Sequence, residues 1–230
     1  MMDYRVATFM TFIRMIAGFC GLQLPMGWSG TTAKSTKLLM KEIDSMVINY
    51  VTSVRQDELW IATEEHGVAI WNQQTNEISF IDEDEGLANN QVWDIHFQAD
   101  NKVWISTMLG ITVYDREVGI TESYTQESGL SGTATYEVVT DQLGRAWVAT
   151  SEGVSIIQPD GGIDTITDVD GEPLDYVYSI EVDNQGTVWI GTERKGVVLI
   201  DQNGDRTHIT KREGLSSNFI YRIVKDNQGN

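Results

Sequence analysis

Histidines, the residues most often used as metal ligands and proton carriers, are few in this chain and far apart in its sequence. The three, His66, His96 and His208, fall in different segments, so they predict no metal cluster. No His-Glu-x-x-His motif, Gly-x-Ser-x-Gly motif or phosphate-binding glycine loop occurs in the sequence. We therefore expect no catalytic residue, no metal site and no cofactor.

Acidic residues are abundant, and two acidic groups look at first like ligand sites. Residues 201–205 read Asp-x-Asn-x-Asp, the opening of a calcium loop, but Arg206 and Arg212 stand where such a loop needs glycine and an acidic residue. The Asn203-Gly204 pair instead predicts a hairpin turn. The run of four carboxylates at 82–85 predicts a solvated loop.

The elements that position all these side chains form a repeat of 42 to 44 residues. One tryptophan, one glycine before a strand and one glycine at the end recur in each unit, and three markers sharing one period indicate a repeat architecture. The markers are Trp60, Trp104, Trp147 and Trp189; Gly67, Gly110, Gly153 and Gly196; and Gly86, Gly129, Gly171 and Gly214.

Each unit contains four short alternating strands joined by Gly, Asn and Asp turns, with no helical period. This pattern predicts an all-β fold, a β-propeller with four complete four-stranded blades plus the start of a fifth, set as an open (truncated) arc. The first strand of each blade is expected nearest the axis. The blades are expected at 46–90, 91–132, 133–174 and 175–218, with a partial fifth at 219–230.

The repeated residues are predicted to be structural. The tryptophans should fill the wedge between adjacent blades, because tryptophan offers the largest apolar surface. The alternative is that they form an aromatic ladder on which sugars stack. The glycines before the third strands should allow a positive φ or a close backbone approach.

Binding residues are expected in the loops at one end of the strands, where side chains differ from unit to unit while the frame stays fixed. Two sets of loops share that end, one joining the second and third strands and one joining successive blades. The candidate ligand-binding residues are Glu64, Glu65, His66, Glu193, Arg194, Lys195, Ser216, Ser217 and Asn218.

Composition excludes some partners and predicts a cellular location. The net charge of −18 over 230 residues argues against nucleic acid, which requires a basic face. Residues 1–30 carry two arginines, a short apolar run and small residues, as a secretory signal peptide or membrane leader does. An apolar leader packed on the fold, a misplaced start site and a lipid attachment at Cys20 are the alternatives. Residues 31–45 are predicted to be a linker.

Two stretches carry a resemblance to a known family. Residues 183–192, DNQGTVWIGT, and 213–229, EGLSSNFIYRIVKDNQG, closely resemble the two-component regulator propeller repeat. In unit three, Gly171-Glu172-Pro173-Leu174 replaces the usual Gly-Leu ending. The resemblance implies the periplasmic or extracytoplasmic sensor part of a bacterial signalling protein. Such propellers precede a membrane helix with a histidine kinase or diguanylate cyclase, and neither module occurs in this sequence.

The first hypothesis is a non-catalytic sensor propeller that binds a small molecule or oligosaccharide, since the ligands of the family are often carbohydrate. Dimerisation of the full-length signalling protein and membrane anchoring beyond Asn230 are further expectations. The second hypothesis is a scaffold propeller that binds a protein partner. The third is an enzyme, such as a propeller lyase or glycosidase.

Overall fold

The computed structural model describes residues 46–226, with gaps at 56–57, 73, 76 and 99–100. The leader and linker predicted for residues 1–45 lie outside the described residues. Within the described part, no helix is long and apolar enough to span a membrane.

Among the described residues, sixteen strands form four sheets, each of four antiparallel strands in sequence order, as predicted, and two more strands form a small hairpin. Each sheet is one blade, and each blade pairs its strands only with their sequence neighbours. The blades are β1 Ile48–Arg55, β2 Glu58–Thr63, β3 Val68–Asn72 and β4 Glu77–Ile81; β5 Val92–Phe97, β6 Lys102–Thr107, β7 Gly110–Asp115 and β8 Gly119–Tyr124; β9 Thr135–Thr140, β10 Ala146–Thr150, β11 Gly153–Ile157 and β12 Ile163–Ile166; β15 Val177–Val182, β16 Val188–Thr192, β17 Val197–Ile200 and β18 Arg206–Ile209.

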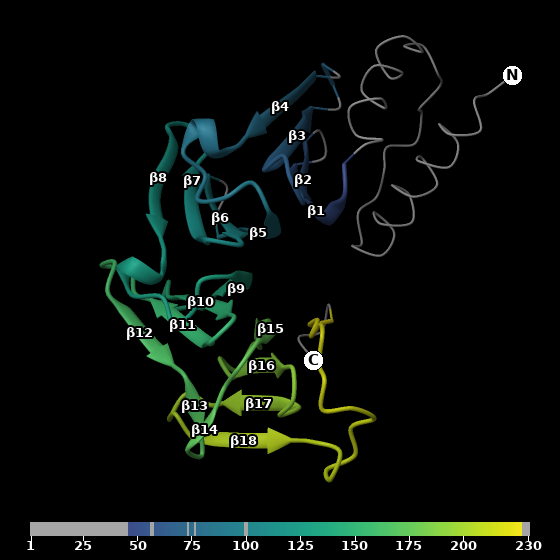
Figure 1. The fold of residues 1–230 in the computed structure, drawn as a ribbon, viewed down its shortest axis with the longest axis vertical. Coiled ribbons are helices and arrows are strands. Elements are labelled where there is room, and N and C mark those ends of the chain that lie inside the picture. Colours follow the sequence, from purple (N-terminus) through teal and green to yellow (C-terminus); the bar gives the residue numbers. More distant parts are fainter. Residues whose placement is uncertain (1–45, 56–57, 73, 76, 99–100, 227–230) are drawn as a thin grey trace, which may run out of the picture.

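The blades follow one another around an open arc (Figure 1). The first strands β1, β5, β9 and β15 line its inner side and contact one another from blade to blade, whereas β4, β8, β12 and β18 lie outside. Residues 219–226 run along the open side, next to β15, and form no strand ladder with the described residues. This segment occupies the place of a fifth inner strand.

The repeated tryptophans pack between blades, as predicted. Trp60 is 2% exposed, and its ring lies edge-on to Phe97 and Tyr114 of the next blade, at centroid distances of 5.3 and 5.7 Å. Trp104 and Trp147 are also buried, while Trp189 is half-buried. Burial leaves Trp60, Trp104 and Trp147 no room to act as a ladder for sugars.

The glycine before each third strand is required by its surroundings. Gly153 has φ of +109°, and a Cβ placed there would lie 2.2 Å from the carbonyl oxygen of Ile166 on β12. The equivalent positions in the other three blades also have positive φ and a carbonyl oxygen at 2.2 or 2.3 Å from the added Cβ. Only glycine fits such a position without moving the outer strand.

Several turns behave as their sequences predict. Asp201 accepts hydrogen bonds from the backbone N–H groups of Asn203 and Asp205, at 2.8 and 2.9 Å, so residues 201–205 are a hairpin turn. The carboxylate run is largely exposed, and it forms a single 3₁₀ turn, η1 Glu83–Glu85, capped by Asp82. A second such turn, η2 Gln126–Ser128, stands at the same place in the next unit.

The third blade contains a feature that the repeat pattern did not predict. After β12 the chain makes a small hairpin from β13 Asp168–Val169 and β14 Glu172–Pro173. It lies where Gly171-Glu172-Pro173-Leu174 replaces the usual Gly-Leu ending. Val169 and Leu174 are buried by this hairpin and join the core between the third and fourth blades.

Candidate functional site

A row of aromatic side chains, one from each of four successive units, lies beside the axis at the loop end of the strands. We call Trp93, Tyr136, Tyr178 and Tyr221 the aromatic row. Its ring centroids are 6.0, 5.2 and 6.1 Å apart in that order. The rings are tilted or edge-on to one another, a favourable geometry for aromatic pairs.

The backbone explains why these side chains leave the sheet. The pairing of β5 with β6 goes from Val92–Thr107 directly to Asp94–Ser106, so Trp93 is an extra, unpaired residue. Tyr136 and Tyr178 occupy the same position in β9 and β15. These are β-bulges, which bend a strand and redirect a side chain and are common beside functional sites.

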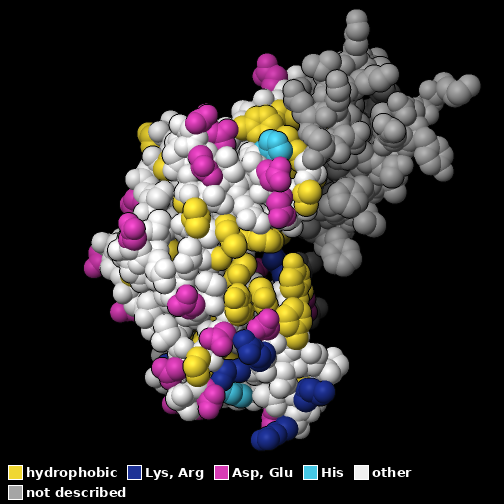
Figure 2. Space-filling view, viewed as in Figure 1, with side chains coloured by type: hydrophobic (Ala, Val, Ile, Leu, Met, Phe, Trp, Pro, Cys, Tyr) yellow, Lys and Arg dark blue, Asp and Glu magenta, His cyan; other side chains and the backbone are white. Residues whose placement is uncertain are grey.

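Two further rings extend this surface. Tyr176 stacks on Tyr178 with centroids 6.2 Å apart, and Phe219 lies 5.6 Å from Tyr178. Tyr176, Phe219 and Tyr221 are 40%, 48% and 69% exposed, so the surface is open to a ligand. Figure 2 shows hydrophobic side chains gathered along the concave side of the arc.

Tyr176 is held in an unfavourable backbone conformation. Its φ is +42°, which is rare for a bulky residue that is not glycine. Its backbone N–H donates to the carbonyl oxygen of Ser151 at 3.1 Å, and its own carbonyl oxygen accepts from Glu193 N–H at 3.0 Å. Strain that persists because neighbouring loops enforce it is typical of functional sites.

The predicted loop residues of the fourth blade lie close to the aromatic row. Burial raises the pKa of the Tyr178 hydroxyl, and the nearby Glu193 carboxylate raises it further. Arg194 contacts Glu193 at 3.0 Å and Asp175 at 3.7 Å, and Lys195 contacts Glu172 at 3.7 Å. Carboxylates and cations therefore border the rings here.

The other predicted residues lie on the same set of loops but in two separate places. Glu64, Glu65 and His66 belong to the first blade, where the Glu64 carboxylate accepts a hydrogen bond from Gln91 at 2.9 Å. Glu65 and His66 are exposed.

The connection from the fourth blade to the fifth unit holds the remaining three. Ser216 is exposed, Ser217 accepts from Phe219 N–H at 3.0 Å, and Asn218 accepts from Lys211 N–H at 2.9 Å. The last two side chains thus shape the loop that leads to Phe219 and Tyr221.

The aromatic row is the part of this surface that sequence reasoning missed. Its members recur at steps of 43, 42 and 43 residues, a signal as regular as that of the tryptophans in the second strands. The alternating strand pattern places the four aromatic residues on the face opposite the core. The direction of their side chains is set by the bulge, which the alternation does not reveal.

Directly below the row lies a second group, Asp94, Glu137 and Arg222, which we call the axial cluster. Asp94 and Glu137 are 3% and 5% exposed. Arg222 contacts Glu137 at 3.0 Å. Burial raises the pKa of Asp94 to about 6, and burial together with the Asp94 charge raises that of Glu137 to about 7.

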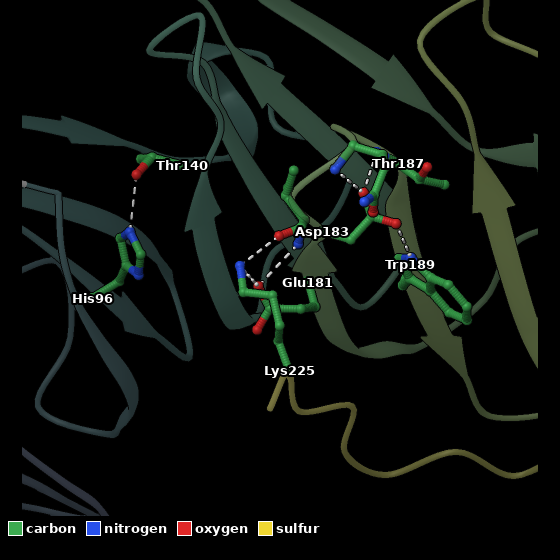
Figure 3. A network of polar contacts seen from close by, with 9 residues as sticks. His96, Thr140, Glu181, Asp183, Thr187, Trp189 and Lys225 are labelled. Carbon is green, nitrogen blue, oxygen red and sulfur yellow. Dashed lines mark hydrogen bonds and ion pairs between the residues drawn. The ribbon is translucent and has the colours of Figure 1, made fainter. Parts of the chain in front are cut away.

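The three histidines belong to three different blades. His96 contacts the Thr140 hydroxyl across the inner strands at 3.0 Å (Figure 3), and burial lowers its pKa to about 4. Among the described residues, no three His, Cys, Asp or Glu side chains gather as metal ligands would.

A hollow of about 320 Å³ lies between β8 and the turns of the third blade. Lys102, Glu122, Tyr124 and Asp160 are among its lining residues, and none of the loop residues predicted from sequence lines it. It is separate from the aromatic row.

The geometry of the aromatic row suits recognition. Partly exposed rings can stack on an apolar face of a ligand, and the bordering carboxylates and cations can bind its polar groups. A set of rings of this kind supplies stacking area and orientation.

Comparisons with known proteins agree with the propeller fold. Residues 171–194 match the family described as two component regulator propeller. No curated protein matches the chain. Among solved structures it is similar to one named as the extracellular domain of a hybrid two component system from B. thetaiotaomicron, at 18% identity and a TM-score of 0.65 over 79% of this chain and 24% of that one.

Two other solved structures show the same architecture. The extracellular domain named for a one component system of B. thetaiotaomicron has 21% identity and a TM-score of 0.63, over 77% of this chain and 24% of that one. Virginiamycin B lyase from Staphylococcus aureus has 18% identity and a TM-score of 0.57, over 69% and 54%.

The chain thus spans about a quarter of the length of the two B. thetaiotaomicron domains. At these identities the likeness establishes a β-propeller fold. Residues 171–194 carry one match to the family described as two component regulator propeller, in the segment that leads from the third blade into the fourth.

Proposed function

We propose that this propeller is the sensor part of an extracytoplasmic bacterial signalling protein and binds an oligosaccharide on the aromatic row without cleaving it. The observation that carries the proposal is the row itself, extended by Tyr176 and Phe219. Four successive units each turn one aromatic side chain out of the sheet at the loop end, and the rings form a continuous surface.

The chemistry of the row supports a saccharide in particular. Flat rings offer apolar area to the C–H faces of sugar rings at little cost in side-chain entropy. Glu193 and Arg194 lie at the edge of this surface and provide an acceptor and a donor for sugar hydroxyls. The strained backbone of Tyr176 also supports a functional role, because strain of this kind is concentrated at functional sites.

The binding test uses the whole chain and a microarray of plant, microbial and host oligosaccharides, followed by calorimetry with the saccharide that binds. Tyr178 contacts both Tyr136 and Tyr221, so Tyr178→Ala should weaken binding at least about tenfold, because it removes one stacking ring. Tyr124→Ala is the comparison variant: Tyr124 lies on the outer strand β8 and lines the separate hollow, so a loss of affinity in that variant alone would place the ligand there. Wild-type affinity in Tyr178→Ala would place the ligand away from the aromatic row.

The same experiment separates the alternative functions. Shortened saccharide products after incubation would indicate a lyase or glycosidase. Failure of every saccharide to bind, with a protein partner captured by the wild type and lost in Tyr178→Ala, would favour the scaffold function.

Signalling and location need separate tests. Cells that produce the Tyr178→Ala protein should lose their transcriptional response to the saccharide while keeping the protein at its normal level. The leader, fused to alkaline phosphatase, should give an active enzyme, because that enzyme folds only after export. An inactive fusion would contradict extracytoplasmic placement.

A further inference from the structure

The residue that follows the bulge in each of the four inner strands, and the residue that follows Tyr221, carry polar groups. These residues are Tyr50, Asp94, Glu137, Ser179 and Arg222. They lie one step below the rings, and three of them bond to the next unit.

The three acceptors among them connect each unit with its successor. Asp94 accepts from Val138 N–H at 3.3 Å, Glu137 from Ile180 N–H at 2.9 Å, and Ser179 from Ile223 N–H at 2.8 Å. Each acceptor satisfies a backbone amide that faces the neighbouring blade and has no ladder partner there. Buried N–H groups left without an acceptor are costly.

Arg222 departs from this pattern, because a guanidinium can only donate. Its side chain returns toward the axis and contacts Glu137 at 3.0 Å, and it lies over the Tyr50 ring with 5.2 Å to the centroid. Arg222 therefore links the fifth unit to the third blade and to the first. It also offsets the charges of two buried carboxylates, Asp94 and Glu137.

The segment that carries Arg222 is also attached to the fourth blade. Ile220 N–H donates to the carbonyl oxygen of Thr192 at 2.9 Å, and Ile223 N–H donates to Ser179. Lys225 contacts the carbonyl oxygen of Val182 at 2.7 Å and the Glu181 carboxylate at 3.3 Å (Figure 3). These partners belong to the fourth blade, whereas Arg222 contacts the third blade and the first.

We propose that Arg222 is a positioning residue of the ligand surface. Through its contacts with Glu137 and Tyr50 it holds Tyr221 and Phe219 beside Tyr178. It thereby couples ligand binding to the docking of the fifth unit on the first and third blades. The ligand half of this inference rests on the proposed function, since Tyr221 and Phe219 belong to the proposed ligand surface. Because coupling between two equilibria is reciprocal, a ligand that contacts Tyr221 should also strengthen the docking of residues 219–226.

The first test needs no ligand. Hydrogen exchange at the Ile220 and Ile223 amides reports how often the segment leaves the fourth blade. A hydrogen bond to a charged group corresponds to about ten- to hundredfold in such an opening equilibrium, so Arg222→Gln should accelerate exchange by about that factor. Arg206→Gln is the control, because Arg206 is an exposed arginine whose side chain donates to the carbonyl oxygen of Asp168, away from the axis.

The double variant Arg222→Gln with Glu137→Gln tests whether Arg222 acts through Glu137. The amide oxygen that replaces the Glu137 carboxylate can still accept from Ile180 N–H, so the hydrogen bond between the third and fourth blades is kept. If the two residues act as a pair, the double variant should exchange no faster than Arg222→Gln alone. If Arg222→Gln fails to fold, Arg222→Lys retains the charge without the planar fork, and it should give an intermediate rate.

The second test measures the affinity of the saccharide identified on the microarray. Arg222→Gln should weaken it at least about tenfold, and the double variant should weaken it no further. Unchanged exchange in Arg222→Gln, or a further acceleration in the double variant, would overturn the positioning role through Glu137. Unchanged affinity despite faster exchange would overturn the coupling. If no saccharide binds the wild type, the proposed function fails, and exchange alone still decides whether Arg222 positions the segment.

Discussion

Replacing Gly153 with alanine should destabilise the protein far more than the same change at Gly204. Both glycines have positive φ, +109° and +84°, so both substitutions introduce backbone strain. The added Cβ at Gly153 would lie 2.2 Å from the carbonyl oxygen of Ile166, whereas at Gly204 nothing lies within 4 Å. The pair therefore separates conformational strain from a steric clash.

The expected losses follow from those two contributions. Positive φ costs an L-residue about 1–2 kcal/mol, which is the whole effect expected for Gly204→Ala. At Gly153 the obstacle is backbone, so no rotamer change relieves it and β12 must shift against β11. Overpacking of this kind adds about 1–3 kcal/mol, which gives a total of about 2–5 kcal/mol for Gly153→Ala.

Urea unfolding followed by tryptophan fluorescence measures both losses. The denaturant slopes of the two variants should match that of the wild type, because a changed slope would signal a different unfolded or native state. Equal free-energy losses in Gly153→Ala and Gly204→Ala would refute the reasoning. It would mean that the outer strand moves away freely and that the close approach has no energetic consequence.

Three other changes test other parts of the molecule. Trp147→Ala should cost about 3–5 kcal/mol in unfolding free energy, since the ring is 4% exposed, and a loss under about 1 kcal/mol would show that it does not fill the wedge between blades. Because the folded pKa values of Asp94 and Glu137 are raised to about 6 and 7, the folded protein holds these protons more tightly than the unfolded chain. Their stabilising contribution is thus full below about pH 4 and is lost as the pH rises toward 7. Glu137→Gln should make the unfolding free energy depend less on pH in that range. A series of melts at different pH values measures this dependence, and the same dependence in the variant as in the wild type would contradict the prediction. Tyr176→Gly relieves a φ of +42° but loses the stack on Tyr178, so stability should stay within about 1 kcal/mol of wild type while saccharide affinity falls; a stable variant with full affinity would remove Tyr176 from the site.

The sequence predicts the blades well because the residues that define them act locally. A glycine with positive φ, a tryptophan in the second strand and an Asn-Gly turn each specify their own short segment, and the period repeats the specification. The hairpin at β13 and β14 was not predictable from that period, because it depends on how Val169 and Leu174 find a place in the core of the next blade.

The candidate site was predictable only as a region. The loops at one end could be inferred from the variation in residues such as Glu193 and Arg194. The aromatic row depends on β-bulges at Trp93, Tyr136 and Tyr178, and a bulge is a property of pairing between strands. The salt bridge from Arg222 to Glu137 joins residues two units apart, and no pattern within one repeat indicates such a contact.

Side chains of one unit accept hydrogen bonds from backbone N–H groups of the next unit, and this has a consequence for how such chains gain units. A unit with Asp, Glu or Ser at the position after its bulge supplies the next unit's amide, and the amides of the Glu137 and Ser179 units are supplied by the unit before. Tandem duplication of such a unit creates a new junction that is already satisfied, so the gene can lengthen by whole units without compensating mutations. A unit with arginine at this position offers no acceptor to a following copy. Arg222 therefore makes its unit a poor template for duplication, and the order of units becomes part of what selection must preserve.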